Sequence, residues 1–151
     1  MEIERKYLVE TLPDLSRFDA VHLSQAYIAR EPVLRIRQEN DRFVFTCKGK
    51  GLLEREELNL PISKETFQTL LKKCDGAVIE KTRYLIPLDQ GLTCELDVFS
   101  GHLSGLILAE VEFSSVEASL AFDPPAFLGR DVTLDPKYQN SNLSLLSADD
   151  F

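Results

Sequence analysis

Like charges recur two positions apart in several segments of this 151-residue chain: Arg35 and Arg37, Lys81 and Arg83, Glu95 and Asp97, and Glu110 and Glu112. Arginine presents a planar fork that binds phosphate oxygens bidentately. Clustered carboxylates are the hard oxygen ligands that Mg²⁺ and Mn²⁺ prefer. The residue types therefore indicate a site for a polyanion that divalent cations bridge to carboxylates.

The spacing of two predicts that these side chains share one face of β-strands, because alternate residues of a strand point to the same side. The same alternation extends the set to Glu2, Glu4, Lys6, Lys48, Arg55 and Glu57. Intervening residues such as Leu34, Ile36 and Val111 are apolar. The ordinary alternative is a sheet whose charged face lies in water, but such a face usually mixes signs. We therefore interpret the charged face as the lining of an enclosed cavity.

Alternation predicts eight extended segments, at residues 1–9, 22–30, 32–38, 42–49, 54–61, 78–87, 92–98 and 105–113. Asn40-Asp41 and the glycine-containing stretches 49–51 and 89–91 are typical of hairpin connections. The predicted fold is mainly β (α+β): a closed eight-stranded antiparallel barrel, which is wide enough for a ligand and leaves no exposed sheet edge.

A few peripheral helices are expected to cover the barrel. Ser63 can cap a helix through Leu71 that Asp75-Gly76 ends, and Ser114 has capping-box spacing to Glu117. A last short helix is expected at residues 141–146. No repeat or long linker is present, so residues 1–151 are interpreted as one domain.

Composition excludes several classes of protein. The net charge of −8 argues against a nucleic-acid partner. The N-terminus is charged and no apolar run approaches the roughly 20 residues that span a bilayer, so we expect a cytoplasmic protein without a membrane partner. The three cysteines have no CxxC spacing, which does not favour a cysteine metal site. The chain is compatible with a monomer or a homodimer.

The opening sequence EIERK, residues 2–6, resembles the ExExK signature of the CYTH, or triphosphate tunnel metalloenzyme, superfamily. Further segments are similar to that family in the expected order: LRIR at 34–37, TCK at 46–48, RxE at 55–57, EKTRY at 80–84, ELDVFSGHLSGL at 95–106 and EVEF at 110–113. ExExK alone is a weak signal, whereas the ordered set is specific. The chain looks most like a compact bacterial inorganic triphosphatase.

The resemblance implies an eight-stranded tunnel with two sets of site residues. The phosphate chain would be bound by Lys6, Arg35, Arg37, Lys48, Arg55, Lys81 and Arg83. The metal would be bound by Glu2, Glu4, Glu57, Glu95, Asp97, Glu110 and Glu112. One position departs from the pattern, because Asn59 stands where family members often have another acid. A weaker metal site, or one completed by a different carboxylate, would follow.

The resemblance extends to the C-terminal stretch around Lys137, Tyr138 and Asn140, which is similar to a KYxN-type end of the family. Two roles are open for it: closing one mouth of the tunnel, or capping of the last helix by Asn140.

The resulting functional hypothesis is hydrolysis of inorganic tripolyphosphate to pyrophosphate and phosphate with Mg²⁺ or Mn²⁺, so the partner is a small-molecule triphosphate. Lys81, crowded by cations, is the candidate general base, with Tyr27 beside it. The alternative is that Lys81 only binds phosphate. Class IV adenylyl cyclase, thiamine triphosphatase, RNA triphosphatase and a binding module without chemistry remain open as alternatives.

Overall fold

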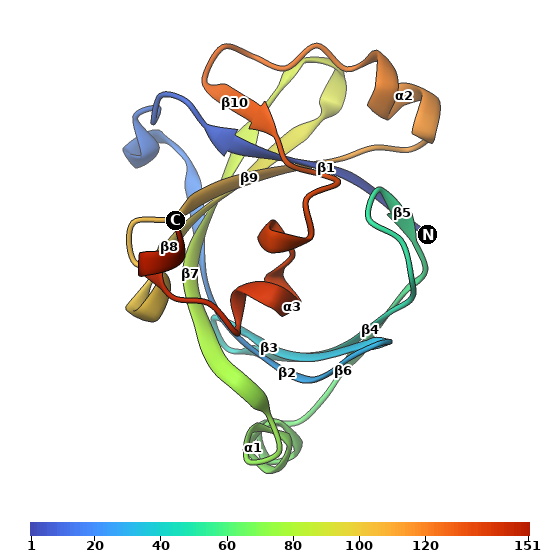
Figure 1. Ribbon diagram of the computed structural model, residues 1–151, viewed down its shortest axis with the longest axis vertical. Coiled ribbons are helices and arrows are strands. Elements are labelled where there is room, and N and C mark those ends of the chain that lie inside the picture. Colours follow the sequence, from blue (N-terminus) through green and yellow to red (C-terminus); the bar gives the residue numbers. More distant parts are fainter.

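The computed structural model describes all 151 residues, about half of which form antiparallel strands wound into a nearly closed barrel (Figure 1). The strands are β1 (Glu2–Val9), β2 (Asp19–Arg30), β3 (Val33–Glu39), β4 (Arg42–Lys48), β5 (Glu54–Arg55), β6 (Glu57–Pro61), β7 (Asp75–Pro87), β8 (Thr93–Ser100), β9 (Ile107–Glu112) and β10 (Leu128–Asp131). Their order in the sheet is β10-β1-β9-β8-β7-β2-β3-β4-β6, and β5 pairs with β1. No helix of the protein is long and apolar enough to span a bilayer.

The barrel is sealed only in part along one seam. β6 pairs with β4, whereas β5 pairs with β1 on the other side of the seam. Only Glu56 separates these two short strands, so the chain crosses the seam there. Pro61 at the end of β6 has no backbone N–H to donate, which suits an edge strand. The prediction of a mainly β antiparallel barrel is confirmed, but ten strands and a seam replace eight strands and full closure.

The predicted β3–β4 hairpin is present. Asn40 adopts a φ of 52°, and asparagine tolerates this left-handed conformation better than most residues. The β4–β5 connection needs glycine at position 51, where φ is 119° and an added Cβ would lie 2.2 Å from the carbonyl oxygen of Glu54. The positive φ angles of Asn40 and Gly51 thus allow β3 to pair with β4 and the chain to continue from β4 to the seam.

The helices differ from their predicted bounds. α1 (Lys64–Leu71) begins as predicted, because Ser63 Oγ accepts a hydrogen bond of 3.0 Å from the backbone N–H of Thr66, but it ends before Asp75, which starts β7. α2 (Val116–Ala121) is capped by Ser115 and not by Ser114. α3 (Asn140–Leu143) is shorter than the predicted 141–146. Cap residues one position apart are hard to distinguish from sequence.

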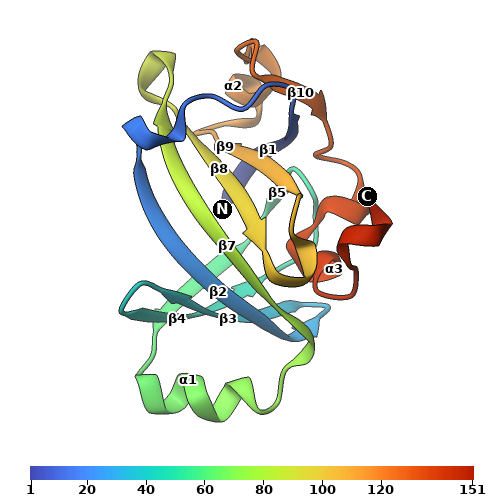
Figure 2. The same cartoon turned by 90° about the vertical axis from the view of Figure 1, so that its left-hand side faces the viewer.

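Three apolar clusters hold these elements together. Two lie outside the barrel: one packs α1 against β2 and β3 through Phe67, Ala26 and Ile36, and the other lies under α2 and β10. The third lies inside one end of the barrel, where Tyr138 and Leu143 of the C-terminal segment pack against inward-facing residues. Figure 2 shows α3 and the C-terminus at this end. The remaining interior is left for polar side chains.

Candidate active site

The strand register directs the alternating charged side chains into the barrel. Directly opposed residues of antiparallel strands share a face. On one wall Lys6 is opposite Glu110, which is opposite Glu95. On the other wall Tyr27 is opposite Arg35. Side chains far apart in sequence therefore meet in one interior.

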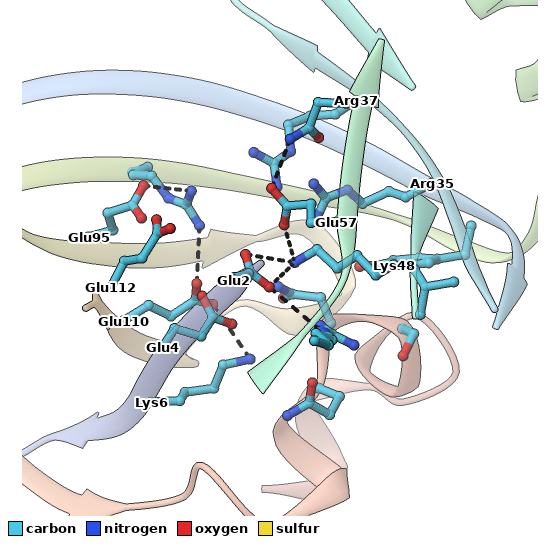
Figure 3. Close-up of a pocket in the computed structure, with 18 residues that line it drawn as sticks. Glu2, Glu4, Lys6, Arg35, Arg37, Lys48, Glu57, Glu95, Glu110 and Glu112 are labelled. Carbon is cyan, nitrogen blue, oxygen red and sulfur yellow. Dashed lines mark hydrogen bonds and ion pairs between the residues drawn. The ribbon is translucent and has the colours of Figure 1, made fainter. Parts of the chain in front are cut away.

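These walls enclose a cavity of about 160 Å³ (Figure 3). Its lining residues are Glu2, Glu4, Lys6, Tyr27, Val33, Arg35, Arg37, Lys48, Arg55, Glu57, Asn59, Arg83, Glu95, Glu110, Glu112, Gln139, Asn140 and Ser141. The structure brings thirteen of the fifteen predicted site residues together there, and the other two, Lys81 and Asp97, lie behind the cavity wall.

Lys81 and Asp97 form a buried ionic layer with Arg83. Lys81 is 0% exposed, and its Nζ lies 2.7 Å from Oδ2 of Asp97. Both oxygens of Asp97 also accept hydrogen bonds from the Arg83 fork, at 2.8 and 3.0 Å. The carboxylate of Asp97 is thus occupied by two cations, and it fixes the orientation of Arg83 toward the cavity.

The wall formed by β3 and β4 is basic and incompletely paired. The Nε atoms of Arg35 and Arg37 are buried and have no hydrogen-bond partner. Burial, followed by the charges of Arg35 and Arg83, lowers the pKa of Arg37 to about 10. A buried donor without a partner costs roughly 1–3 kcal/mol, more if charged. This wall is therefore prepared to receive an anion.

The wall formed by β1, β8 and β9 is acidic, and its carboxylates differ in how far neighbouring cations offset the effect of burial. Burial would raise the pKa of Glu110, but Lys6 and Arg83 hold it well below its usual range. Burial, followed by the charges of Glu110 and Glu2, raises the pKa of Glu4 to about 8, and no hydrogen bond contributes there. Glu4 is the carboxylate whose ionised form gains most from a nearby cation.

Ion pairs bridge the seam where backbone pairing stops. Lys48 Nζ lies 3.0 Å from Glu2 Oε1 and 3.3 Å from Glu57 Oε2, and Arg55 Nε lies 3.6 Å from Glu2 Oε1 (Figure 3). Burial and then a hydrogen bond with Glu57 raise the pKa of Glu2. Burial also acts to raise the pKa of Glu57. Interactions with Glu2, Lys48 and Asn59 outweigh the effect of burial and lower this pKa to about 2. β1, β4, β5 and β6 are thus joined by charge.

Asn59, the departure from the family pattern, connects the seam to the basic wall. Its Nδ2 donates to Glu57 Oε1 at 2.8 Å, and its Oδ1 accepts from Thr46 Oγ1 at 2.6 Å. Thr46 in turn accepts from Arg35 Nη2 at 3.3 Å. The departure was visible in the sequence, whereas this relay depends on the β3–β4–β6 register.

Five cavity-lining residues were not among the predicted site residues: Val33, Asn59, Gln139, Asn140 and Ser141. The last three come from the C-terminal segment, and the resemblance of this stretch to a KYxN-type end was the available signal. Lys6 Nζ donates to the carbonyl oxygen of Tyr138 at 2.8 Å, which ties the segment to the interior. The N-cap of α3 is Gln139, so the capping role considered for Asn140 was wrong.

The donor set fits a hard divalent cation. Glu4 is a buried carboxylate that faces other carboxylates, and carboxylate oxygens are the preferred ligands of Mg²⁺. No three acidic, histidine or cysteine side chains already converge in a metal-binding geometry. The chemistry of the donors suits the ion, and side-chain adjustment on binding would complete its coordination.

Comparison with known families agrees with this architecture. Residues 1–119 match the CYTH domain. The chain belongs to the CYTH family. The match covers every strand of the barrel interior and stops before β10 and the C-terminal segment.

Two CYTH relatives are similar over nearly their whole length. An inorganic triphosphatase of Nitrosomonas europaea is 44% identical over 147 residues, which cover 95% of this chain and 97% of the relative. An inorganic triphosphatase of Acetivibrio thermocellus is 37% identical over 147 residues, covering 94% and 92%. Both alignments therefore extend beyond residue 119, where the CYTH match ends.

Solved structures show the same fold. The crystal structure of an inorganic triphosphatase matches with a TM-score of 0.72 and 42% identity, covering 97% of this chain and 95% of that one. A Hippeastrum protein with a dominant triphosphatase activity matches with a TM-score of 0.61 and 20% identity, covering 80% and 83%. The second likeness is one of fold alone.

Proposed function

We propose that this CYTH protein hydrolyses inorganic tripolyphosphate to pyrophosphate and phosphate with Mg²⁺ or Mn²⁺. The observation that carries the proposal is the cavity in which unpaired arginine donors on β3 face the uncompensated carboxylate of Glu4 on β1. A phosphate chain with a divalent cation supplies the counter-charge for both walls. The near-full-length likeness to two inorganic triphosphatases supports the same substrate.

The size of the cavity favours an inorganic chain over a nucleotide or thiamine triphosphate. Sites for drug-sized ligands occupy roughly 300–1,000 Å³. This cavity measures about 160 Å³, and Tyr27 is its only aromatic lining residue. A nucleobase or thiazolium ring would therefore have to lie outside the cavity, so the cavity lining provides no contacts that select ATP or thiamine triphosphate, which weighs against adenylyl cyclase or thiamine triphosphatase activity.

The basic side chains act by position and charge. Arg35, Arg37 and Arg83 would bind phosphoryl oxygens, with Asp97 holding Arg83 in orientation. Lys6, Lys48 and Arg55 would bind the remaining phosphates, at the cost of their present ion pairs with carboxylates. Preorganised cations of this kind stabilise the charge that develops on the leaving group.

The metal would be held by carboxylates of the acidic wall and the seam: Glu2, Glu4, Glu57, Glu95, Glu110 and Glu112. A divalent ion held by these carboxylates would neutralise phosphate charge and polarise the bond that breaks. Glu4 contributes the most, because burial beside Glu110 and Glu2 disfavours its charge in the absence of a cation.

For proton transfer we assign Tyr27 as the residue that orients the attacking water and Lys81 as the base. Lys81 does not line the cavity, so it would have to accept the proton through an intervening water. Burial is the main cause that lowers the pKa of Lys81, to about 8, so its neutral form is accessible close to neutral pH. Tyr27 lines the cavity, and its hydroxyl accepts a hydrogen bond of 3.4 Å from Gln25. In Lys81→Met, kcat is expected to fall. A raised KM with an unchanged kcat would show that Lys81 contributes only to phosphate binding and is not the base.

A substrate panel tests the proposed function. Tripolyphosphate, pyrophosphate, ATP and thiamine triphosphate are assayed separately with Mg²⁺ and with Mn²⁺. Phosphate release from tripolyphosphate is expected to be far faster than from the others. Turnover of ATP to cyclic AMP at a comparable rate would make the protein a cyclase. Tight tripolyphosphate binding without any turnover would make it a binding module.

A further inference from the structure

The C-terminal segment closes one end of the cavity. Figures 1 and 2 together place α3 across one mouth of the barrel. Tyr138 and Leu143 are 8% and 0% exposed and pack in the inner apolar cluster. Lys6 Nζ holds the segment from inside through Tyr138 O, and Arg30 Nε holds it from outside through Ser141 O at 3.0 Å. The segment is therefore a fixed part of the wall.

A second hollow lies on the far side of this segment. It has a volume of about 610 Å³, and its lining includes Arg30, Lys50 and Asn142. Val33, Arg55, Gln139 and Ser141 line both hollows. Gln139 and Ser141 therefore lie in a partition between the two hollows, together with Val33 and Arg55.

Exposure along the cavity shows which end is open. Lys6 and Tyr27, next to the C-terminal segment, are 3% and 2% exposed. At the opposite end the side chain of Glu95 is 30% exposed, and Glu112 is exposed. A ligand thus enters past the carboxylates and meets the partition at the blind end.

Asn140 presents a free amide at this blind end. It lines only the central cavity, and its Oδ1 is buried without a hydrogen-bond partner. An amide has donors and an acceptor, and rotation about its last bond exchanges them. Asn142, two residues on, lines only the outer hollow and donates to Pro136 O at 2.7 Å. The amide of Asn142 therefore has a hydrogen-bond partner within the protein, whereas the buried amide oxygen of Asn140 has none.

We propose that Asn140 hydrogen-bonds the terminal phosphate of the bound chain and that residues 139–141 set the cleavage register by stopping the chain there. The proposal rests on the proposed function for its substrate class. Because the chain cannot thread through the partition, the bond that breaks lies at a fixed number of phosphates from the end. Chains longer than three phosphates would extend out of the open mouth and be cut in one register only.

Binding of tripolyphosphate tests the role of Asn140 without requiring turnover. Calorimetry is performed with Asn140→Asp and with the matched control Asn142→Asp, and melting temperatures confirm that both are folded. Asn140→Asp replaces a donor with a charge that repels phosphate, and we expect binding to weaken about tenfold to a hundredfold. Asn142→Asp should bind like wild type. Equal affinities of the two folded variants would overturn the proposal, and Asn140→Ala replaces Asn140→Asp if the latter does not fold.

The register is tested with tetrapolyphosphate during a first turnover, before the products are cleaved again. One product pair is expected, either phosphate with tripolyphosphate or two pyrophosphates. A mixture of both pairs would show that the chain slides past residues 139–141 and would contradict the proposal. If wild type binds tripolyphosphate but hydrolyses none, the proposed function fails, and the calorimetric comparison still decides the role of Asn140.

Discussion

The two walls of the cavity hold like charges in different ways. The basic wall on β3 leaves Nε of Arg35 and Arg37 without partners. The acidic wall is compensated at Glu110, which lies 3.5 Å from Lys6, but not at Glu4. Uncompensated charge thus remains on both walls of one interior. Such an arrangement lowers stability when empty and prepares the cavity for a ligand that carries both signs.

The largest effect is expected from the uncompensated point of the acidic wall. Glu4→Gln removes a proposed metal ligand, and the loss of several kcal/mol of charge stabilisation is expected to lower kcat by about a hundredfold or more. The same change should raise the melting temperature of the metal-free protein, because burial penalises the charge of Glu4. Phosphate release and thermal unfolding measure the two effects.

Glu56→Gln is the matched control for this prediction, since Glu56 is exposed. Its activity and stability should stay close to those of wild type. Full activity of Glu4→Gln would remove the distinction between compensated and uncompensated carboxylates.

A somewhat smaller effect is expected from the basic wall. Arg35→Met removes a charged donor that awaits phosphate, so tripolyphosphate binding should weaken about tenfold to a hundredfold. Stability should change little, because the lost hydrogen bond to Thr46 is offset by less repulsion with Arg37. Calorimetry and melting curves check this, with exposed Arg42→Met as the control. A large loss of stability with unchanged affinity would make Arg35 a structural residue.

The pH dependence sharpens the same comparison. The pKa of Glu4 is raised from 4.5 to about 8, so the unfolded chain loses this proton as pH rises while the folded protein keeps it. Stability from this group is therefore present at low pH and is lost between about pH 5 and about pH 8. Mg²⁺ must displace the proton, so its affinity should rise up to about tenfold per pH unit over this window. Melting curves with and without Mg²⁺ measure it, and a pH-independent Mg²⁺ effect would contradict it.

The smallest effect is expected at the Asn59 relay between the seam and the basic wall. Asn59→Asp places a second carboxylate beside Glu57 and removes the amide donor at 2.8 Å. Mg²⁺ affinity should increase by a factor of up to about ten. The new carboxylate also raises the pKa of Glu57, so at low pH protonation of Glu57 opposes the gain. Titration with Mg²⁺ checks the direction. Weaker Mg²⁺ binding would show that the amide itself is needed to orient Glu57.

Alternation in the sequence was sufficient to predict much of the barrel and its interior. Because side chains alternate along a strand, the sequence predicts that Arg35, Arg37 and Glu110 share the inner face, and all three line the cavity. Local caps were less predictable: Ser63 caps α1, but Ser115 takes the place expected for Ser114. Adjacent serines offer the same chemistry, and tertiary packing selects between them.

Alternation along a strand does not predict how far an inward-facing side chain lies from the cavity. Lys81 has the same strand parity as Arg83, yet it is fully buried against Asp97 and does not line the cavity. Parity fixes the face of a side chain, whereas its distance from the cavity depends on the neighbours that fill the barrel. The place of Asn140 depended in the same way on how the C-terminal segment returns to the barrel.

The most direct test of the opposed walls is a crystal structure of the wild-type protein with tripolyphosphate and Mn²⁺, recorded with anomalous scattering. We expect a phosphate chain along the cavity, in contact with Arg35 and Arg37, and an anomalous peak beside Glu4. A phosphate chain bound on the outer face of the barrel, or Mn²⁺ held away from Glu4, would contradict the arrangement.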